Sequence, residues 1–185
     1  MTHQHPEGVM EPRISVSTTV RAWEDAQKVV EAIQKLFPDW APDRIPERAS
    51  FPSERRAQLM HGKADSLELI LNLMRTQRIL DTALDAMSMN LEFDTTVFDL
   101  SRQAAMAGKV AFALEDINLG GKLTVSLSGE DLGIWIEQQT WHEGRNEIPR
   151  STGDDLSMRK SGSPVEWFDK RGYPTINQEE EEGSP

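Results

Sequence analysis

The stretch Ser66-Leu-Glu-Leu-Ile-Leu-Asn-Leu-Met-Arg-Thr-Gln-Arg-Ile-Leu-Asp-Thr-Ala-Leu-Asp-Ala-Met-Ser-Met89 is the largest apolar segment of the chain and the one that decides its fold. Its apolar residues recur at helical intervals, at Leu67, Leu69, Ile70, Leu73, Met74, Leu80, Leu84 and Met87. A stripe of that width has to be covered by a sheet or by other helices. The polar residues 75–78 interrupt the stripe near its middle, so the pattern favours two helices joined by a kink over one helix of about six turns.

The sequence before this stretch contains strand and helix patterns in turn. Residues 13–20 place apolar and polar side chains at alternate positions, which predicts a strand with one buried face. A helical stripe follows at 24–37, with acidic residues at its start and Pro38 at its end. Residues 39–56 contain three prolines and follow neither period, so we expect a long loop. A short second strand is predicted at 57–61.

Strand patterns predominate after the central stretch. Residues 95–100 alternate and predict a third strand, and the small, polar run 101–108 predicts a short turn of helix closed by a glycine. Residues 110–114 and 123–127 alternate again on either side of a Gly-Gly pair, which predicts a hairpin. The Ser-Gly-Glu-Asp sequence at 128–131 has the form of a capping box and predicts a final helix.

Together these patterns predict an α+β fold. The order strand, helix, short strand, two helices, three strands and helix favours a two-layer sandwich, in which an antiparallel sheet of four to five strands carries helices on one face. With 185 residues the chain has the length of one domain, which we place at 13–140. We expect a disordered arm at 1–12 and an acidic disordered tail at 141–185, where Gly, Ser, Pro and charged residues predominate.

The predicted tail contains one aromatic island, at 164–174. Trp167, Phe168 and Tyr173 lie within it, in a chain whose aromatic content is only 6%. Large rings in a solvated segment commonly have a surface on which to dock, so these three residues are candidate partner-binding residues. A disordered segment whose aromatic residues have no partner is an equally good interpretation.

Composition excludes several functional classes. The chain has no cysteine, which removes disulfides, thiolate nucleophiles, zinc fingers and iron–sulfur clusters. No window approaches eighteen consecutive apolar residues and the N-terminal sequence lacks the regions of a secretion signal, so we expect a cytoplasmic protein that does not enter a membrane. The net charge of -11 opposes nucleic-acid binding, because Lys and Arg supply most of the affinity for phosphate. More than half of this excess lies outside residues 13–138, which hold 19 acidic and 14 basic residues.

The sequence offers no convincing catalytic or metal site. His61 and His142 are isolated from other candidate ligands. Asp81 and Asp85 are four residues apart and could share a helix face as metal ligands do, but a solvated helix flank explains such a pair more often. The Gly-Gly pair at 120–121 lacks the Lys-Ser/Thr pair of a phosphate-binding loop. We therefore predict a protein that is not an enzyme and that uses no cofactor or metal.

A cluster of positive and amide side chains is the strongest candidate for a binding site. It consists of Arg75, Arg78, Arg102, Gln103 and Lys109. Arg75 and Arg78 are one helical turn apart, so their guanidinium groups can emerge on the same side and contact adjacent phosphates. The other three residues would extend this patch if the small, polar turn packs near the kink. The competing interpretation is internal: Arg78 would pair with Asp81 or Asp99, and Gln103 would satisfy backbone groups at a bend.

Three segments of the chain also resemble a known family. Residues 74–83 read Met-Arg-Thr-Gln-Arg-Ile-Leu-Asp-Thr-Ala, residues 98–110 contain Arg-Gln-Ala-Ala before a glycine and a strand pattern, and residues 115–120 read Glu-Asp-Ile-Asn-Leu-Gly. In this order they resemble the signature of a small archaeal family of uncharacterised, predicted RNA-binding proteins, over roughly residues 13–140. The resemblance implies RNA as the partner and a fold like that of the large-subunit ribosomal protein that binds 5S RNA. Fold analogy alone does not establish a function.

Two functional hypotheses follow. The leading one is a non-catalytic RNA-binding or ribosome-associated protein that contacts the RNA backbone through the arginine patch. The alternative is a protein–protein interaction module that uses the acidic tail and its aromatic island. Deletion of residues 141–185 separates them. It should strengthen RNA binding under the first hypothesis, because charge repulsion is relieved, and abolish partner capture under the second.

Overall fold

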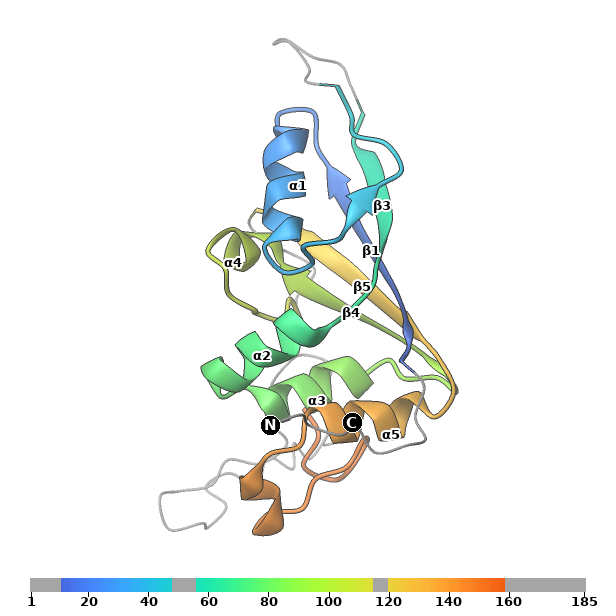
Figure 1. Cartoon of the computed structure of the whole chain (residues 1–185), viewed down its shortest axis with the longest axis vertical. Coiled ribbons are helices and arrows are strands. Elements are labelled where there is room, and N and C mark those ends of the chain that lie inside the picture. Colours follow the sequence, from blue (N-terminus) through green and yellow to red (C-terminus); the bar gives the residue numbers. More distant parts are fainter. Residues whose placement is uncertain (1–10, 48–55, 115–119, 159–185) are drawn as a thin grey trace, which may run out of the picture.

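A single antiparallel sheet contains all of the strands in the described part of the chain, which comprises residues 11–47, 56–114 and 120–158 of this computed structural model (Figure 1). The elements are β1 (Arg13–Val20), α1 (Ala26–Gln34), β2 (Ala41–Pro42), β3 (Gln58–Ala64), α2 (Glu68–Gln77), α3 (Leu80–Ser88), β4 (Thr95–Ser101), α4 (Arg102–Met106), β5 (Lys122–Ser128), α5 (Leu132–Gln139) and the 3-10 helix η1 (Glu143–Asn146). The strands lie in the order β2-β3-β1-β5-β4, and all neighbours are antiparallel. The predicted α+β class and its single antiparallel sheet are confirmed.

One face of the sheet is buried and the other is open. In β1, Ile14, Val16 and Val20 are at most 4% exposed, whereas the alternate residues Ser15 and Ser17 are only half-buried. The same period of two continues in β3, β4 and β5. Figure 1 shows α1, α2 and α4 along one side of the sheet. The helices therefore cover the apolar face, as the alternation of the strands predicted.

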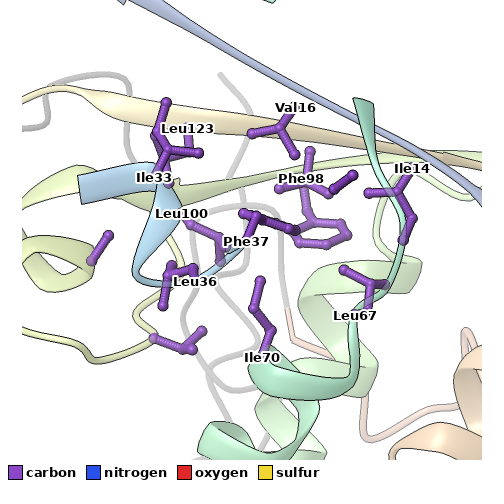
Figure 2. Close-up of a cluster of buried hydrophobic side chains, with 14 of the residues drawn as sticks. Ile14, Val16, Ile33, Leu36, Phe37, Leu67, Ile70, Phe98, Leu100 and Leu123 are labelled. Carbon is purple, nitrogen blue, oxygen red and sulfur yellow. The ribbon is translucent and has the colours of Figure 1, made fainter. Parts of the chain in front are cut away.

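The core lies between the buried sheet face and the helices. Figure 2 shows Val16 and Phe98 of the sheet among Phe37 and Ile70 from the helical layer, and none of these side chains is more than 4% exposed. Burial of a side chain of this size contributes about 1.5–3 kcal/mol. The buried Trp40 donates its ring N–H to the carbonyl oxygen of Val16 at 3.1 Å. This bond fastens the segment after α1 to the centre of the sheet.

The central stretch forms two helices, as its polar interruption predicted. α2 ends at Gln77 and α3 begins at Leu80. Between them Arg78 adopts φ 58° and ψ 42°, a left-handed conformation that ends α2 and redirects the chain. At the other end of α2, Leu67 is the N-cap residue, and the hydroxyl of Ser66 just before it accepts a hydrogen bond from the N–H of Glu68 at 3.0 Å.

The predicted hairpin between residues 110–114 and 123–127 is wrong. The second segment belongs to β5, whose neighbours in the sheet are β1 and β4. Residues 110–114 lie instead along the outer edge of β4, where Phe112 forms a bridge with Leu100. A strand can pair with only two neighbours. Since β1 and β4 occupy both edges of β5, the 110–114 segment cannot pair with β5 and lies instead on the free edge of β4.

The final helix forms as predicted, but its predicted capping box does not. Ser128 is the last residue of β5, where it pairs with both Arg13 and Thr95. The N-cap residue is Asp131, whose φ is 53°, and no side chain caps the helix there. Because α5 begins only at Leu132, Ser128 lies too far before the first turn to cap its amide groups.

Residues 141–158 are folded against the domain, which differs from the disordered tail that we expected there. Arg145, at the end of this segment's η1 helix, is 6% exposed. Its Nε donates to Oδ1 of Asp81 at 3.1 Å, and Arg150 Nη2 donates to Oδ1 of Asp85 at 2.5 Å. Composition could not reveal this, because the partners lie on α3, far earlier in the sequence. The aromatic island, the rest of the predicted tail and most of the predicted arm lie outside the described residues.

Candidate functional site

A side-chain clamp joins α2 to the segment after α4. The side-chain amide of Gln77 donates to the carbonyl oxygen of Val110 at 2.8 Å, and its Oε1 accepts from the N–H of Val110, also at 2.8 Å. A primary amide can make both bonds at once because it carries a donor and an acceptor side by side. Arg78 follows Gln77, and Lys109 precedes Val110. The clamp therefore brings Arg78 and Lys109 to the same corner of the molecule.

Arg78 and Lys109 are the exposed cations of this corner. Arg78 is the C-cap residue of α2, in a left-handed conformation that costs a residue with a Cβ about 1–2 kcal/mol and that glycine adopts more readily. Its side chain is exposed, and it makes no hydrogen bond or ion pair within the described parts of the chain. The same is true of the side chain of Lys109. Within the described ranges, neither charge is neutralised by another side chain.

Arg75 is also exposed, but its guanidinium group is engaged. Nη1 donates to Oδ1 of Asn72 at 3.2 Å, and Nη2 donates to the carbonyl oxygen of Gln139 at 3.0 Å. The second bond places a positive charge at the C-terminal end of α5, where the helix dipole favours it. Arg75 and Arg78, which we expected to act together on adjacent phosphates, thus have different surroundings.

A further lysine, which the sequence analysis did not single out, extends the positive side chains toward α1. Lys35 is exposed, and its Nζ donates to the carbonyl oxygen of Met106 at 2.5 Å. Met106 ends α4, three residues before Lys109. The positive side chains thus lie near the ends of three helices: Lys35 after α1, Lys109 after α4 and Arg78 after α2. No local signal in the sequence linked the end of α1 to α4, because the contact arises from the packing of both helices on the sheet.

Arg102 is buried, contrary to the expectation that it faces solvent beside the other cations. Its side chain is 4% exposed and forms an ion pair with Glu24. Its Nε donates to the carbonyl oxygen of Gly120 at 2.9 Å, and its Nη1 donates to that of Thr19 at 3.0 Å. Burial lowers the pKa of Arg102, and the Glu24 carboxylate only partly opposes this. Arg102 thus joins three segments from inside and exposes only a small part of its surface.

Gln103 is exposed on α4, as expected. Together with Lys28, Val29 and Met106 it lines a cavity of about 400 Å³ between α1 and α4. It does not satisfy backbone groups at a bend, as the internal interpretation suggested, because none of the described residues hydrogen-bonds to its side chain. Gln77 has that role instead. Sequence reasoning missed Gln77, since one glutamine in a helix carries no signal of its partner.

The internal interpretation is also wrong for Arg78. Asp99 accepts from Nζ of Lys122 at 2.6 Å, and Asp81 contacts Nε2 of His142 at 3.0 Å. Neither carboxylate pairs with Arg78. The two acidic groups that could have neutralised it inside the fold are therefore committed to other cations.

Asp81 and Asp85, considered above as metal ligands, bind basic groups instead. Burial by itself raises the pKa of Asp81, but the hydrogen bonds and charges of His142 and Arg145 outweigh it and hold the pKa below its usual value. At Asp85 burial prevails over the attraction of Arg150 and raises the pKa. Within residues 11–47, 56–114 and 120–158, no group of three or more His, Cys, Asp or Glu side chains could hold a metal ion. In the same ranges, no helix is both long and apolar enough to cross a membrane.

Comparison with known proteins identifies the relatives of this chain. The family model described as RNA binding matches residues 13–119, from β1 to beyond α4. The UPF0201 protein of Pyrobaculum neutrophilum is 32% identical over 104 residues, which are 56% of this chain and 70% of the relative. The chain belongs to the UPF0201 family. The resemblance to an archaeal family of predicted RNA-binding proteins is thereby confirmed.

Other UPF0201 proteins extend the likeness along the chain. That of Methanothermobacter thermautotrophicus is 28% identical over 142 residues, which are 77% of this chain and 98% of the relative. The crystal structure of a UPF0201 protein from Methanococcus jannaschii has a TM-score of 0.60 and 28% identity, and the match covers 70% of this chain and 99% of that one. Gln77, Arg78 and Lys109 all lie in the region that the RNA-binding family model matches.

Proposed function

We propose that this protein binds RNA without catalysing a reaction on it, and that Arg78 and Lys109 contact the RNA backbone. The observation that supports this most is the state of Arg78, an exposed guanidinium group in a left-handed backbone conformation with no partner among the described residues. Membership of a family whose model is described as RNA binding makes phosphate the expected partner of such a cation. The forked donors of arginine match phosphate oxygens, and lysine adds a second point charge beside it.

The backbone of Arg78 supports a role outside the fold. Glycine at this C-cap would avoid about 1 kcal/mol of strain, and the exposed arginine gains no contact within the described chain in return. Strained residues without a structural partner are typical of binding sites. The Gln77 clamp uses the side chain of Gln77 and the backbone of Val110, and neither depends on the side chain of Arg78. Position 78 should therefore stay beside Lys109 when Arg78 is replaced.

The acidic character of the chain sets the expected behaviour of the complex. With a net charge of -11, the chain as a whole repels RNA, so the affinity depends on local contacts. Arg75 and Lys35 flank the pair and extend the positive surface with the donors that they do not use internally. We expect binding that weakens steeply as salt concentration rises. Ribosomal RNA is the first RNA to test, because the implied fold resembles that of a ribosomal protein.

Arg78→Gly is the sharpest test, because the fold and the proposed function should respond in opposite directions. Relief of the left-handed strain should leave the free energy of unfolding unchanged or raise it by up to about 1 kcal/mol. RNA affinity should fall, as measured by filter binding to ribosomal RNA at about 50 mM salt. The slope of log K against log salt concentration should decrease by about 1, and by about 2 in Arg78→Gly/Lys109→Gln.

Lys28→Gln is the matched control. Lys28 is exposed on α1, so the variant changes the net charge by the same amount away from the clamp. Its affinity should stay within about twofold of the parent chain, because screening limits the effect of a distant charge. Equal losses in Lys28→Gln and Arg78→Gly, or full binding by the double variant, would remove Arg78 and Lys109 as the contact.

A further inference from the structure

The open face of the sheet is rich in hydroxyl groups. Serine and threonine occupy more than half of the outward positions of β1, β3, β4 and β5. Those at the centre of the sheet are Ser15, Ser17 and Thr19 of β1 and Thr124, Ser126 and Ser128 of β5. None of these six residues is buried. The described helices α1, α2 and α4 lie on the other face of the sheet (Figure 1). The sheet therefore presents a broad polar surface rather than a second apolar one.

The strand register gathers these hydroxyl groups into a continuous strip. Ser15 lies opposite Ser126, and Ser17 lies opposite Thr124. Residues directly opposite in an antiparallel pair have Cβ atoms about 4.5–5.5 Å apart, so their side chains are immediate neighbours. Thr124 donates to Oδ1 of Asp99 on β4 at 2.6 Å, which continues the strip onto the next strand.

Charges on this face favour an anionic occupant. Arg13 and Lys63 are exposed beside the strip, and neither side chain has a hydrogen bond or ion pair in the described chain. Among the described outward positions of the four long strands, Asp99 is the one acidic residue. It forms an ion pair with Lys122, whose Nζ lies 2.6 Å from its Oδ2. Asp43, whose carboxylate lies beside the outward-facing His61, is a further acidic group on this side. Arg13, Lys63 and Lys122 together still outnumber Asp99 and Asp43, although the whole chain has a net charge of -11.

His61 completes the strip at the β3 edge. Its Nε2 lies 2.7 Å from Oγ of Ser15, and its Nδ1 lies 3.7 Å from the carboxylate of Asp43. Among the described outward positions of the four long strands, His61 is the one residue with an aromatic ring. The large apolar residues at these positions are Leu59 and Val97. A protein interface needs an apolar core, and single-stranded RNA needs rings on which bases stack, so both occupants are disfavoured here.

We infer that the open face of the sheet is a docking surface for the backbone of double-stranded RNA. Duplex RNA presents phosphates and 2′-hydroxyls across a wide, shallow minor groove. Serine and threonine hydroxyls can both donate to and accept from 2′-hydroxyls, while Arg13 and Lys63 meet phosphates at the edge. Strands of seven or eight residues make the face about 24–27 Å long, and four strands make it about 15 Å wide.

The inference rests on the proposed function and adds a second contact to it. Arg78 and Lys109 belong to the helical layer, whereas the hydroxyl strip lies on the other face of the sheet. Two contacts on opposite sides of one domain act on separate segments of RNA. Variants of the two surfaces should therefore weaken binding independently, with effects on log K that add.

The test uses the full chain with a 20-base-pair RNA duplex of mixed sequence as the probe, and the DNA duplex of the same sequence for comparison. Arg13→Gln/Lys63→Gln removes the two free cations, and Ser126→Glu places a negative charge in the middle of the strip. We expect each to lower the affinity for the RNA duplex about tenfold, and the first to reduce the salt slope by about 2. Gln27→Glu on α1 makes the same one-unit charge change as Ser126→Glu, and Lys28→Gln/Gln27→Glu makes the same two-unit change as Arg13→Gln/Lys63→Gln; both controls should stay within about twofold.

Each outcome distinguishes the two proposals. Loss of binding in both face variants, with folding confirmed by circular dichroism, supports the docking surface. RNA binding that falls in Arg78→Gly but is unaffected by the face variants overturns the docking surface and leaves the proposed function standing. A parent chain that retains no RNA at about 50 mM salt overturns both. Equal affinity for the RNA and DNA duplexes overturns the recognition of 2′-hydroxyls.

Discussion

Replacement of Arg102 by methionine tests whether this residue supports the fold or binds RNA. Methionine keeps most of the length of the side chain but removes every donor of the guanidinium group. The ion pair with Glu24 is lost, as are the hydrogen bonds to the carbonyl oxygens of Gly120 and Thr19. The partly buried carboxylate of Glu24 then lies without its partner, which is the costly way to break such a pair.

The magnitude follows from the burial of the two charged groups. Removing one partner of a buried pair costs about 3–5 kcal/mol. The low end applies to Arg102→Met, because the Glu24 side chain is 18% exposed and regains some water. We therefore expect a loss of about 3 kcal/mol, which lowers the midpoint of thermal unfolding by roughly 6–12 °C in a chain of this length. Arg102→Met/Glu24→Gln should recover about 1–2 kcal/mol, since no unpaired carboxylate remains.

Urea denaturation of the two variants and the parent chain measures these free energies. RNA affinity should be determined at a temperature at which Arg102→Met is still folded, and there it should match that of the parent. Arg78→Met is the control, because it removes an exposed arginine and should change stability by no more than about 0.5 kcal/mol. If Arg102→Met keeps full stability while its RNA affinity falls, the assignment of Arg102 to the interior is refuted.

Three more predictions concern the clamp, the glycines and the C-terminal segment. Gly121→Ala should cost roughly 2–4 kcal/mol in a urea titration, because φ is 82° and a Cβ would overlap the buried guanidinium group, whereas Gly108→Ala, with φ 68° and open space, should cost only about 1 kcal/mol. Gln77→Leu should cost about 1–3 kcal/mol and accelerate hydrogen exchange at the Val110 amide; an unchanged exchange rate would show that the clamp does not hold this segment. The folded-state pKa of Asp81 lies below its unfolded value of 3.8, so its stabilisation of η1 is present above that pH and is lost as pH falls through the folded pKa. Hydrogen-exchange protection of the η1 amides in the parent chain should drop as the pH falls below 3.8. A drop of the same size in Asp81→Asn would contradict the role of the Asp81 carboxylate in holding η1.

Local periodicity was sufficient for most of the longer elements of the fold, but not for β2, which lies in the predicted loop, or for η1. The alternation at 13–20, 95–100 and 123–127 identified three strands and their buried faces, because one side chain in two must leave water when a sheet is covered on one side. The polar break at 75–78 identified the kink between α2 and α3 for a similar reason. The partner of the 110–114 segment was missed, because alternation shows that a segment is extended but not which edge of the sheet it joins.

The sequence by itself determined the fold class and a short list of charged residues, and only the tertiary structure decided what each of those residues does. Arg78 and Arg102 have the same side chain and both lie in segments that resemble the family, yet one is exposed and the other is buried against Glu24. The reason is that burial and ion pairing depend on which distant segments meet, and that is set by the order of strands in the sheet. The same packing folds residues 141–158 onto α3 and aligns the hydroxyl groups of β1 and β5, neither of which any local window of sequence contains.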